Sequence, residues 1–186
     1  PGASAGRFGI DCRGPDNRSK NIDTIFKFDP KGKIVKSFGR GMFIWPHGLL
    51  VDREGNVWVT DAASQQAVEM AAKAGVHAGH QIFKFSPDGK LLMTLGKAGG
   101  GRGTEYFTEP NTLFIAPDGP MYVAEGHSSR APSAPNPGST ARIFKSPKAG
   151  TPIKQWGQGG KGPAAPARMG RARADSQGRP GGRIWN

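Results

Sequence analysis

The sequence predicts an all-β protein, specifically a β-propeller built from four-stranded antiparallel blades. A hairpin-like segment occurs three times, beginning at Ile25, Ile82 and Ile143, which are about 60 residues apart. The composition includes 29 Gly and 16 Pro in 186 residues, and this favours many turns and short strands over packed helices. A β-sandwich would not place near-identical hairpins in regular order, so a propeller explains the repeats better.

The repeated hairpin comprises residues 25–39, 82–96 and 143–157. Each copy has an apolar strand, a short turn, a second strand and a closing Gly. The turns at residues 29–32 (DPKG) and 86–89 (SPDG) contain the residue types that favour tight reversals of the chain. We therefore expect two antiparallel strands from each copy.

A second two-strand unit follows each of the first two hairpins. WPHGLLVDREGNVWVTD (residues 45–61) matches EPNTLFIAPDGPMYVAE (residues 109–125), with two apolar strands around an acidic turn in each. One hairpin and one such unit make a period of four strands. Residues 64–75 (SQQAVEMAAKAG) have a helical composition and predict a short insertion. About three blades fit the chain, fewer than the four to eight that close a propeller.

Two segments of different character divide the chain. Residues 1–163 form the predicted partial propeller, and residues 164–186 are either a poorly patterned basic tail or a disturbed blade. No run of about 18 apolar residues occurs, which excludes a transmembrane helix. The chain opens on PGASAGRFG, without a signal peptide, so we expect either a protein that is not exported or a fragment without its natural start. The single Cys12 allows no internal disulfide.

The net charge of +12 raises the question of nucleic-acid binding. Lysines such as Lys31, Lys33 and Lys90 occupy turn positions, where water solvates them. The densest basic run, residues 168–183, lies in the segment without a strand pattern. No stripe of alternating aromatic and basic residues occurs, so the charge alone does not favour nucleic acid as a partner.

The chain has four histidines: His47, His77, His80 and His127. They form no HExxH motif, and the sequence has no nucleophile elbow, P-loop or dinucleotide-binding fingerprint. His77 and His80 stand close enough in sequence to chelate a metal, but an ordinary surface loop is the simpler interpretation of their Gly-containing segment.

His47 differs because of its position in the repeat. It precedes the strand that we expect to be innermost in its blade, where side chains from several blades converge on the central channel. One imidazole from each blade can build a metal site there. The alternative is a turn histidine that is hydrogen-bonded to the backbone. The equivalent position in the next blade carries Asn111, so the ligand is not repeated.

Three stretches together resemble a known family. They are PHGLLVDREGNVWVTD, HQIFKFSPDGK (residues 80–90) and FTEPNTLFIAPDGPMYVAEGHSSR (residues 107–130). They resemble NHL-repeat six-bladed propellers and, among them, the peptidyl-α-hydroxyglycine α-amidating lyases, over roughly residues 20–162. The resemblance implies six blades, of which about three are present, and export to a secreted or periplasmic location. It also implies cleavage of a peptidyl-α-hydroxyglycine to an amidated peptide and glyoxylate.

The resemblance also implies cofactors. In that family three histidines of Pro-His motifs hold zinc in the channel, and backbone carbonyls help to hold calcium. His47 matches the first zinc ligand, and the carbonyl of Leu49 matches a calcium ligand. The second Pro-His motif would fall near residues 169–170, where this chain has no histidine, and the third would lie beyond the last residue.

Two further residues are implied in catalysis by the resemblance. Arg7 matches a channel arginine that helps to hold the substrate. His127 stands where the family has a tyrosine that is proposed as the base, and an imidazole there is able to take a proton. The alternative function is a non-catalytic propeller that binds a protein or small ligand, because a propeller fold does not fix a function. We therefore expect a small peptide substrate or a protein ligand as the partner.

Overall fold

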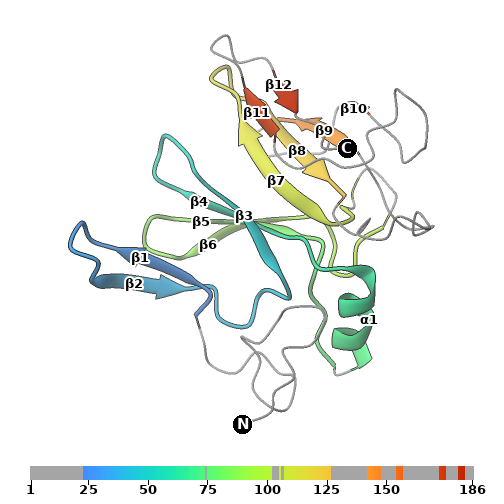
Figure 1. The fold of residues 1–186 in the computed structure, drawn as a ribbon, viewed down its shortest axis with the longest axis horizontal. Helices are drawn as coiled ribbons and strands as arrows, with labels where there is room; N and C mark the ends of the chain where they lie inside the picture. Colours follow the sequence, from blue (N-terminus) through green and yellow to red (C-terminus); the bar gives the residue numbers. More distant parts are fainter. Residues whose placement is uncertain are drawn as a thin grey trace.

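The structure is a computed structural model that describes residues 23–73, 75–101, 105, 107–126, 142–147, 154–156, 172–174 and 180–182. Two four-stranded antiparallel sheets dominate it (Figure 1). The first has the order β3-β4-β5-β6, and the second has the order β10-β9-β8-β7. Sequential strands are therefore neighbours throughout, which is the up-and-down topology of a propeller blade.

The strands have the following bounds. The first sheet contains β3 (Pro46–Val51), β4 (Val57–Asp61), β5 (Ile82–Phe85) and β6 (Leu91–Leu95), and the second contains β7 (Pro110–Ile115), β8 (Met121–Glu125), β9 (Ile143–Ser146) and β10 (Lys154–Trp156). Two antiparallel pairs accompany the sheets: β1 (Ile25–Phe28) with β2 (Ile34–Phe38), and β11 (Ala172–Ala174) with β12 (Pro180–Gly182).

The turn between β1 and β2 shows why the repeated hairpins form. The Oδ1 atom of Asp29 accepts hydrogen bonds from the main-chain nitrogens of Lys31 and Lys33, each at 2.9 Å. Gly32 adopts φ +81°, a left-handed conformation that glycine reaches without strain. The turn sequence therefore closes the hairpin through local hydrogen bonds, as the sequence predicts.

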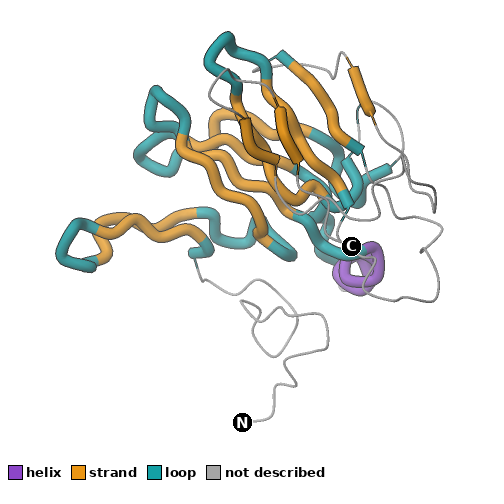
Figure 2. Tube along the Cα trace, turned by 45° about the horizontal axis from the view of Figure 1, so that its top comes forward, coloured by secondary structure: helices purple, strands orange, loops and turns teal. Residues whose placement is uncertain are grey.

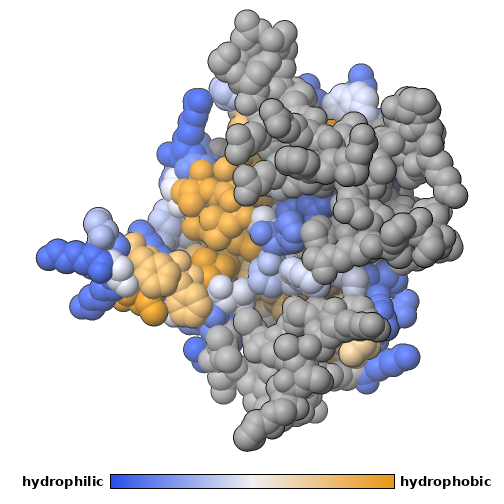
Figure 3. Space-filling model, viewed as in Figure 1, coloured by the Kyte–Doolittle hydropathy of each residue, from blue (hydrophilic) through white to orange (hydrophobic). Residues whose placement is uncertain are grey.

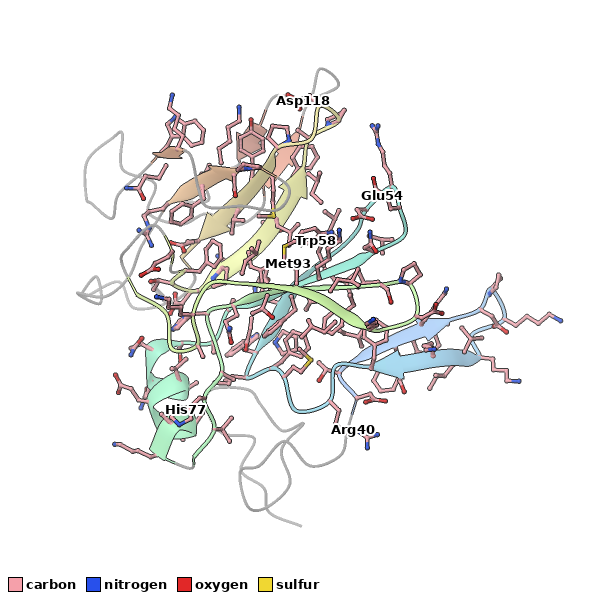
Figure 4. All side chains as sticks on the ribbon, turned by 180° about the vertical axis from the view of Figure 1, so that it is seen from behind. Arg40, Glu54, Trp58, His77, Met93 and Asp118 are labelled. Carbon is pink, nitrogen blue, oxygen red and sulfur yellow. The ribbon has the colours of Figure 1, made fainter. Side chains whose placement is uncertain are left out.

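The core lies between the two sheets. Trp58 and Ile82 of the first sheet are fully buried and pack in one cluster with residues of the second. That cluster also contains Phe107, Leu113, Met121, Val123 and Phe144. Figure 4 shows Trp58 and Met93 on the side of the first sheet that faces the second. Because side chains alternate along a strand, Val59 and Phe83 point to the opposite face.

The β1–β2 pair packs on that opposite face. Ile25 and Phe38 join Val59, Phe83 and other residues in a second apolar cluster. Several apolar side chains remain exposed on the pair and on β3, namely Phe26, Phe28, Ile34, Val35, Leu49 and Val51. Figure 3 shows apolar atoms gathered over this part of the surface. In a larger propeller such a face would be covered by a further part of the blade ring.

The helical insertion is present as α1 (Gln65–Lys73), between β4 and β5. The hydroxyl of Ser64 accepts a hydrogen bond from the nitrogen of Ala67 at 3.2 Å and so caps the first turn. Val68 and Ala71 pack against Ile44. In Figure 2 the helix lies on the other side of the molecule from the β1–β2 pair.

The fold class that the sequence predicts is confirmed. In the described residues the regular structure consists of antiparallel strands and one helix, with the strands in two four-stranded sheets and two two-stranded pairs, as expected for about three blades. In the part of the chain that the structure describes, no helix is both long and apolar enough to cross a membrane. A total of six blades and the division at residues 163–164 stay predictions.

Candidate functional site

The candidate site lies where the first strands of the two sheets, β3 and β7, contact one another. We call it the β3–β7 junction and define it by His47, Gly48, Thr60 and Asn111. Pro46 pairs with Asp61 and Pro110 pairs with Glu125, so the two strands begin at equivalent places in their sheets. The junction therefore joins the starts of the equivalent first strands of the two sheets, and their position as the innermost strands around a channel stays a prediction.

The imidazole of His47 is exposed, and one of its nitrogens is anchored across the junction. Nδ1 lies 2.8 Å from the main-chain oxygen of Asn111. Because a carbonyl oxygen only accepts hydrogen bonds, Nδ1 carries the hydrogen in this contact. In the neutral ring, Nε2 then bears the lone pair. The ring is thus held in the tautomer in which Nε2 is able to bind a metal ion or a proton.

The hydroxyl of Thr60 forms the centre of the junction. Oγ1 accepts a hydrogen bond from the nitrogen of Gly48 at 2.8 Å and donates one to the main-chain oxygen of Asn111 at 3.0 Å. Thr60 is fully buried. The main-chain oxygen of Asn111 therefore receives two donors, the hydroxyl of Thr60 and the ring of His47.

Gly48 allows the two strands to approach this closely. A Cβ atom at residue 48 would lie 2.5 Å from the main-chain oxygen of Asn111 and 3.0 Å from the Cα of Thr112. Both neighbours are backbone atoms, which cannot move aside as the end of a flexible side chain can. The sequence Pro-His-Gly therefore places the glycine that this close approach requires directly after the imidazole that contacts Asn111.

Asn111 has a structural role at the position that corresponds to His47. Its side chain is 1% exposed, and its Nδ2 donates a hydrogen bond to the main-chain oxygen of Gly126 at 2.5 Å. The amide thus links the start of β7 to the end of β8. This agrees with the expectation that the histidine is not repeated in the second sheet.

Buried carboxylates fix the segments that lead into β3 and β7. Asp61 accepts hydrogen bonds from the nitrogens of Ile44 at 2.9 Å and Trp45 at 2.6 Å. Glu125, the equivalent residue of β8, accepts one from the nitrogen of Thr108 at 2.8 Å. Neither residue was singled out from the sequence, although both end the repeated two-strand unit, as VTD and VAE.

Glu125 also forms a buried ion pair with Arg142. Its Oε2 atom lies 2.8 Å from Nη2 and 2.9 Å from Nε of the guanidinium. The carboxylate side chain is 0% exposed and the guanidinium side chain 10%. Since removing one member would leave the other charged in a poorly solvated place, the two residues act as a unit.

His80 is buried, so the expectation of a surface loop is wrong for this residue. It is 0% exposed, and its Nδ1 accepts a hydrogen bond from the nitrogen of Glu109 at 2.8 Å. Burial lowers the pKa of His80 from 6.5 to about 4. His77, in contrast, is exposed near α1 (Figure 4). The pair is therefore not a chelating site, and His80 instead holds the start of β7.

The His47 imidazole fits one position of a zinc site. Neutral imidazole is a common zinc ligand, and a hydrogen bond from its second nitrogen to a carbonyl orients it in such sites. In the described ranges no group of three or more His, Cys, Asp or Glu side chains is placed to hold a metal ion. The described residues thus supply one ligand, and further ligands would have to come from elsewhere.

The other residues that the resemblance implies are placed as follows. Leu49 lies on β3, two residues after His47, with its backbone opposite Val59 of β4 and its side chain 60% exposed. The calcium role of its carbonyl stays a prediction. Arg7 and His127 lie outside the described residues.

A shallow cleft of about 240 Å³ lies at the opposite ends of β3 and β7. It is bordered by the β3–β4 and β7–β8 turns, which carry Glu54 and Asp118 (Figure 4). The neighbouring carboxylate of Asp52 already accepts hydrogen bonds from the Asn56 and Trp58 side chains. The Asp52 carboxylate is thus engaged within its own turn and strand, and we take the β3–β7 junction as the candidate site.

Comparisons with known proteins find relatives whose names refer to peptide amidation. No protein-family model matches the chain. Peptidyl-alpha-hydroxyglycine alpha-amidating lyase 1 of Drosophila melanogaster is 36% identical over 153 residues, covering 78% of this chain and 22% of that protein. Peptidyl-glycine alpha-amidating monooxygenase of Mus musculus is 32% identical over 145 residues, covering 75% of this chain and 12% of that protein.

A further relative bears the name of the repeat. NHL repeat-containing protein 3 of Mus musculus is 29% identical over 115 residues, covering 59% of this chain and 30% of that protein. The chain thus spans between 12% and 30% of the length of these three relatives. Over most of its own length, it is similar to a segment of each.

Proposed function

Because the chain is homologous to peptidyl-α-hydroxyglycine α-amidating lyases over 78% of its length, we propose that the intact protein is a lyase-like β-propeller. It binds a metal ion in its central channel through Nε2 of His47. The observation that carries the proposal is the 2.8 Å contact between Nδ1 of His47 and the main-chain oxygen of Asn111. In this contact Nδ1 carries the hydrogen, so in the neutral ring the lone pair that a metal ion would bind is on Nε2.

The proposed reaction cleaves a peptidyl-α-hydroxyglycine. The hydroxyl group loses its proton, its oxygen becomes the aldehyde oxygen of glyoxylate, and the bond between the α-carbon and the amide nitrogen breaks. The nitrogen takes up a proton and leaves as the terminal amide of the shortened peptide. Atoms and electrons balance without an oxidant or a reductant.

The residues of this chain have separate roles in the proposal. His47 holds the metal ion, which would supply a Lewis acid for a substrate oxygen. The imidazole of His127 takes the hydroxyl proton as general base, and Arg7 holds the substrate carboxylate by charge. The carbonyl of Leu49 contributes to a calcium site. The remaining zinc ligands come from outside the described residues, and the resemblance to the lyases supports a secreted or periplasmic location.

A glyoxylate assay on the full-length protein tests the proposal. The protein is loaded with zinc and calcium and incubated with a synthetic peptide that ends in α-hydroxyglycine, and glyoxylate and amidated peptide are quantified. Wild-type protein should release both products in equal amounts. His47→Ala should lose the activity, and His77→Ala, which removes an exposed histidine beside α1, should keep it.

The same assay also tests the alternative, non-catalytic function. A folded wild-type protein that releases no glyoxylate in the presence of zinc and calcium would overturn the lyase proposal. Direct binding of an uncleaved peptide by that inactive protein would then favour a non-catalytic propeller that binds a peptide or a protein.

A further inference from the structure

We infer that Thr60 is a positioning residue for His47, acting through the main-chain carbonyl of Asn111. The hydroxyl of Thr60 and the imidazole of His47 donate to the same oxygen, at 3.0 Å and 2.8 Å. The expected effect of Thr60 on the tautomer of His47 concerns the metal-free protein and does not depend on the proposed function. Only the expected effect on metal affinity rests on that function.

The direction of the hydrogen bonds at Thr60 is determined by its partners. The nitrogen of Gly48 is a donor, so the hydroxyl oxygen accepts from it at 2.8 Å. The single hydroxyl hydrogen is then directed to the oxygen of Asn111, which only accepts. The result is a directed chain from Gly48 through Thr60 to Asn111, and successive bonds of this kind strengthen one another.

The chain of hydrogen bonds fixes the position of the Asn111 oxygen. Thr60 is 0% exposed and Asn111 is 1% exposed, so the junction contains little room for water to replace a lost hydrogen bond. Because Gly48 has no Cβ, the main-chain oxygen of Asn111 lies only 2.5 Å from the position that a Cβ atom would occupy. Removing the hydroxyl would leave the nitrogen of Gly48 without this acceptor and would free the oxygen to shift away from His47.

Comparison of the two sheets connects Thr60 with His47 in particular. The aligned pairs Pro46–Asp61 and Pro110–Glu125 make Ala124 the counterpart of Thr60. In the second sheet, therefore, the threonine is replaced by alanine and the histidine by Asn111. Threonine and histidine occur together in the first sheet and are both absent from the equivalent positions of the second. If every blade required a hydroxyl at this position, residue 124 would be a serine or threonine as well.

Imidazole nitrogen NMR on the full-length, metal-free protein at about pH 8 tests the inference. Wild type should show His47 with its hydrogen on Nδ1, and Thr60→Ser, which keeps the hydroxyl, should show the same. Thr60→Val removes the hydroxyl at nearly constant volume and should shift the ring toward the other tautomer. Thr94→Val makes the same exchange on the exposed outer strand β6 and should have no effect.

Metal titration supplies the second readout. Thr60→Val should weaken zinc binding by up to about tenfold, the lower end of the effect of removing a direct hydrogen-bond partner of a metal ligand, because Thr60 acts through the oxygen of Asn111. Thr60→Ser should restore the affinity. An unchanged His47 tautomer in folded Thr60→Val would overturn the inference. If Thr60→Val does not fold, Thr60→Ala replaces it. Failure of both to fold while Thr60→Ser folds would assign Thr60 to folding rather than positioning and would also overturn it.

The two proposals fail in different ways. If wild-type protein binds no zinc but Thr60→Val still changes the His47 tautomer, the proposed function fails and the inference about Thr60 stands. If wild type binds zinc through His47 and Thr60→Val changes neither the tautomer nor the affinity, the inference about Thr60 fails and the proposed metal binding by His47 stands.

Discussion

Nδ1 of His47 and the main-chain oxygen of Asn111 lie 2.8 Å apart although the two residues are separated by 64 positions in the sequence. The contact joins the first strands of two blades and determines which imidazole nitrogen carries a hydrogen. The packing of one sheet against the next thereby determines the tautomer of the imidazole, and so which nitrogen of His47 is available for the proposed metal binding.

Gly48→Ala should separate the two strands. The new Cβ would lie 2.5 Å from the main-chain oxygen of Asn111, and overpacking of this kind costs about 2–3 kcal/mol of unfolding free energy. Urea unfolding would measure the loss, and the NMR signals of His47 should shift.

Gly32→Ala is the matched control for that substitution. A Cβ atom at residue 32 would meet no other atom within 4 Å, but Gly32 adopts φ +81°, so alanine there costs about 1–2 kcal/mol through backbone strain alone. The His47 signals should stay unchanged in this variant. Unchanged His47 signals in Gly48→Ala as well would contradict the close approach at the junction.

His80 should make the protein less stable as the pH falls. Burial lowers its pKa to about 4, so between pH 6.5 and 4 the unfolded chain binds a proton at this residue and the folded chain does not. The stabilising contribution is complete above the ordinary pKa and is lost as the pH falls through that window, by about 2 kcal/mol at pH 5.

His80→Asn isolates this contribution. Asparagine tolerates the φ of +61° found here, and its side-chain oxygen is able to accept the hydrogen bond from the nitrogen of Glu109. Urea unfolding at pH 7.5 and pH 5 should show a larger loss for wild type than for the variant. Equal losses would mean that His80 is protonated in the folded protein.

The Glu125–Arg142 ion pair should behave as a unit. Arg142→Met leaves the fully buried carboxylate without the guanidinium, and breaking such a pair costs about 3–5 kcal/mol. The double variant Glu125→Gln/Arg142→Met removes both charges and should regain more than half of that loss. A double-mutant cycle on unfolding free energies measures the coupling, and strictly additive effects would show that the pair is not coupled.

The fold was predictable from the sequence because its determinants are local. Turn residues such as those at 29–32, apolar alternation and the repeat itself all lie within short segments, and the strands form where these patterns place them. The helix at residues 65–73 was predicted for the same reason. The position of His47 at the start of β3, equivalent to that of Asn111 at the start of β7, followed from comparing the two repeats.

The site was predictable only in part because its contacts are distant in sequence. The role of Thr60 depends on β7 lying beside β3, and no local pattern contains that information. The burial of His80 depends on Glu109 and on Gly100, where a Cβ would approach the imidazole within 2.6 Å. A segment that looks like a surface loop in the sequence is therefore an inner support of the next blade.

The zinc content of the full-length protein shows whether Nε2 of His47 is a metal ligand. Protein is loaded with zinc, freed of unbound metal by gel filtration and measured by elemental analysis, alongside His47→Ala and His77→Ala. Wild type and His77→Ala should hold stoichiometric zinc, and His47→Ala should lose it. Metal-free wild type, or undiminished zinc in folded His47→Ala, would contradict the proposed role of His47.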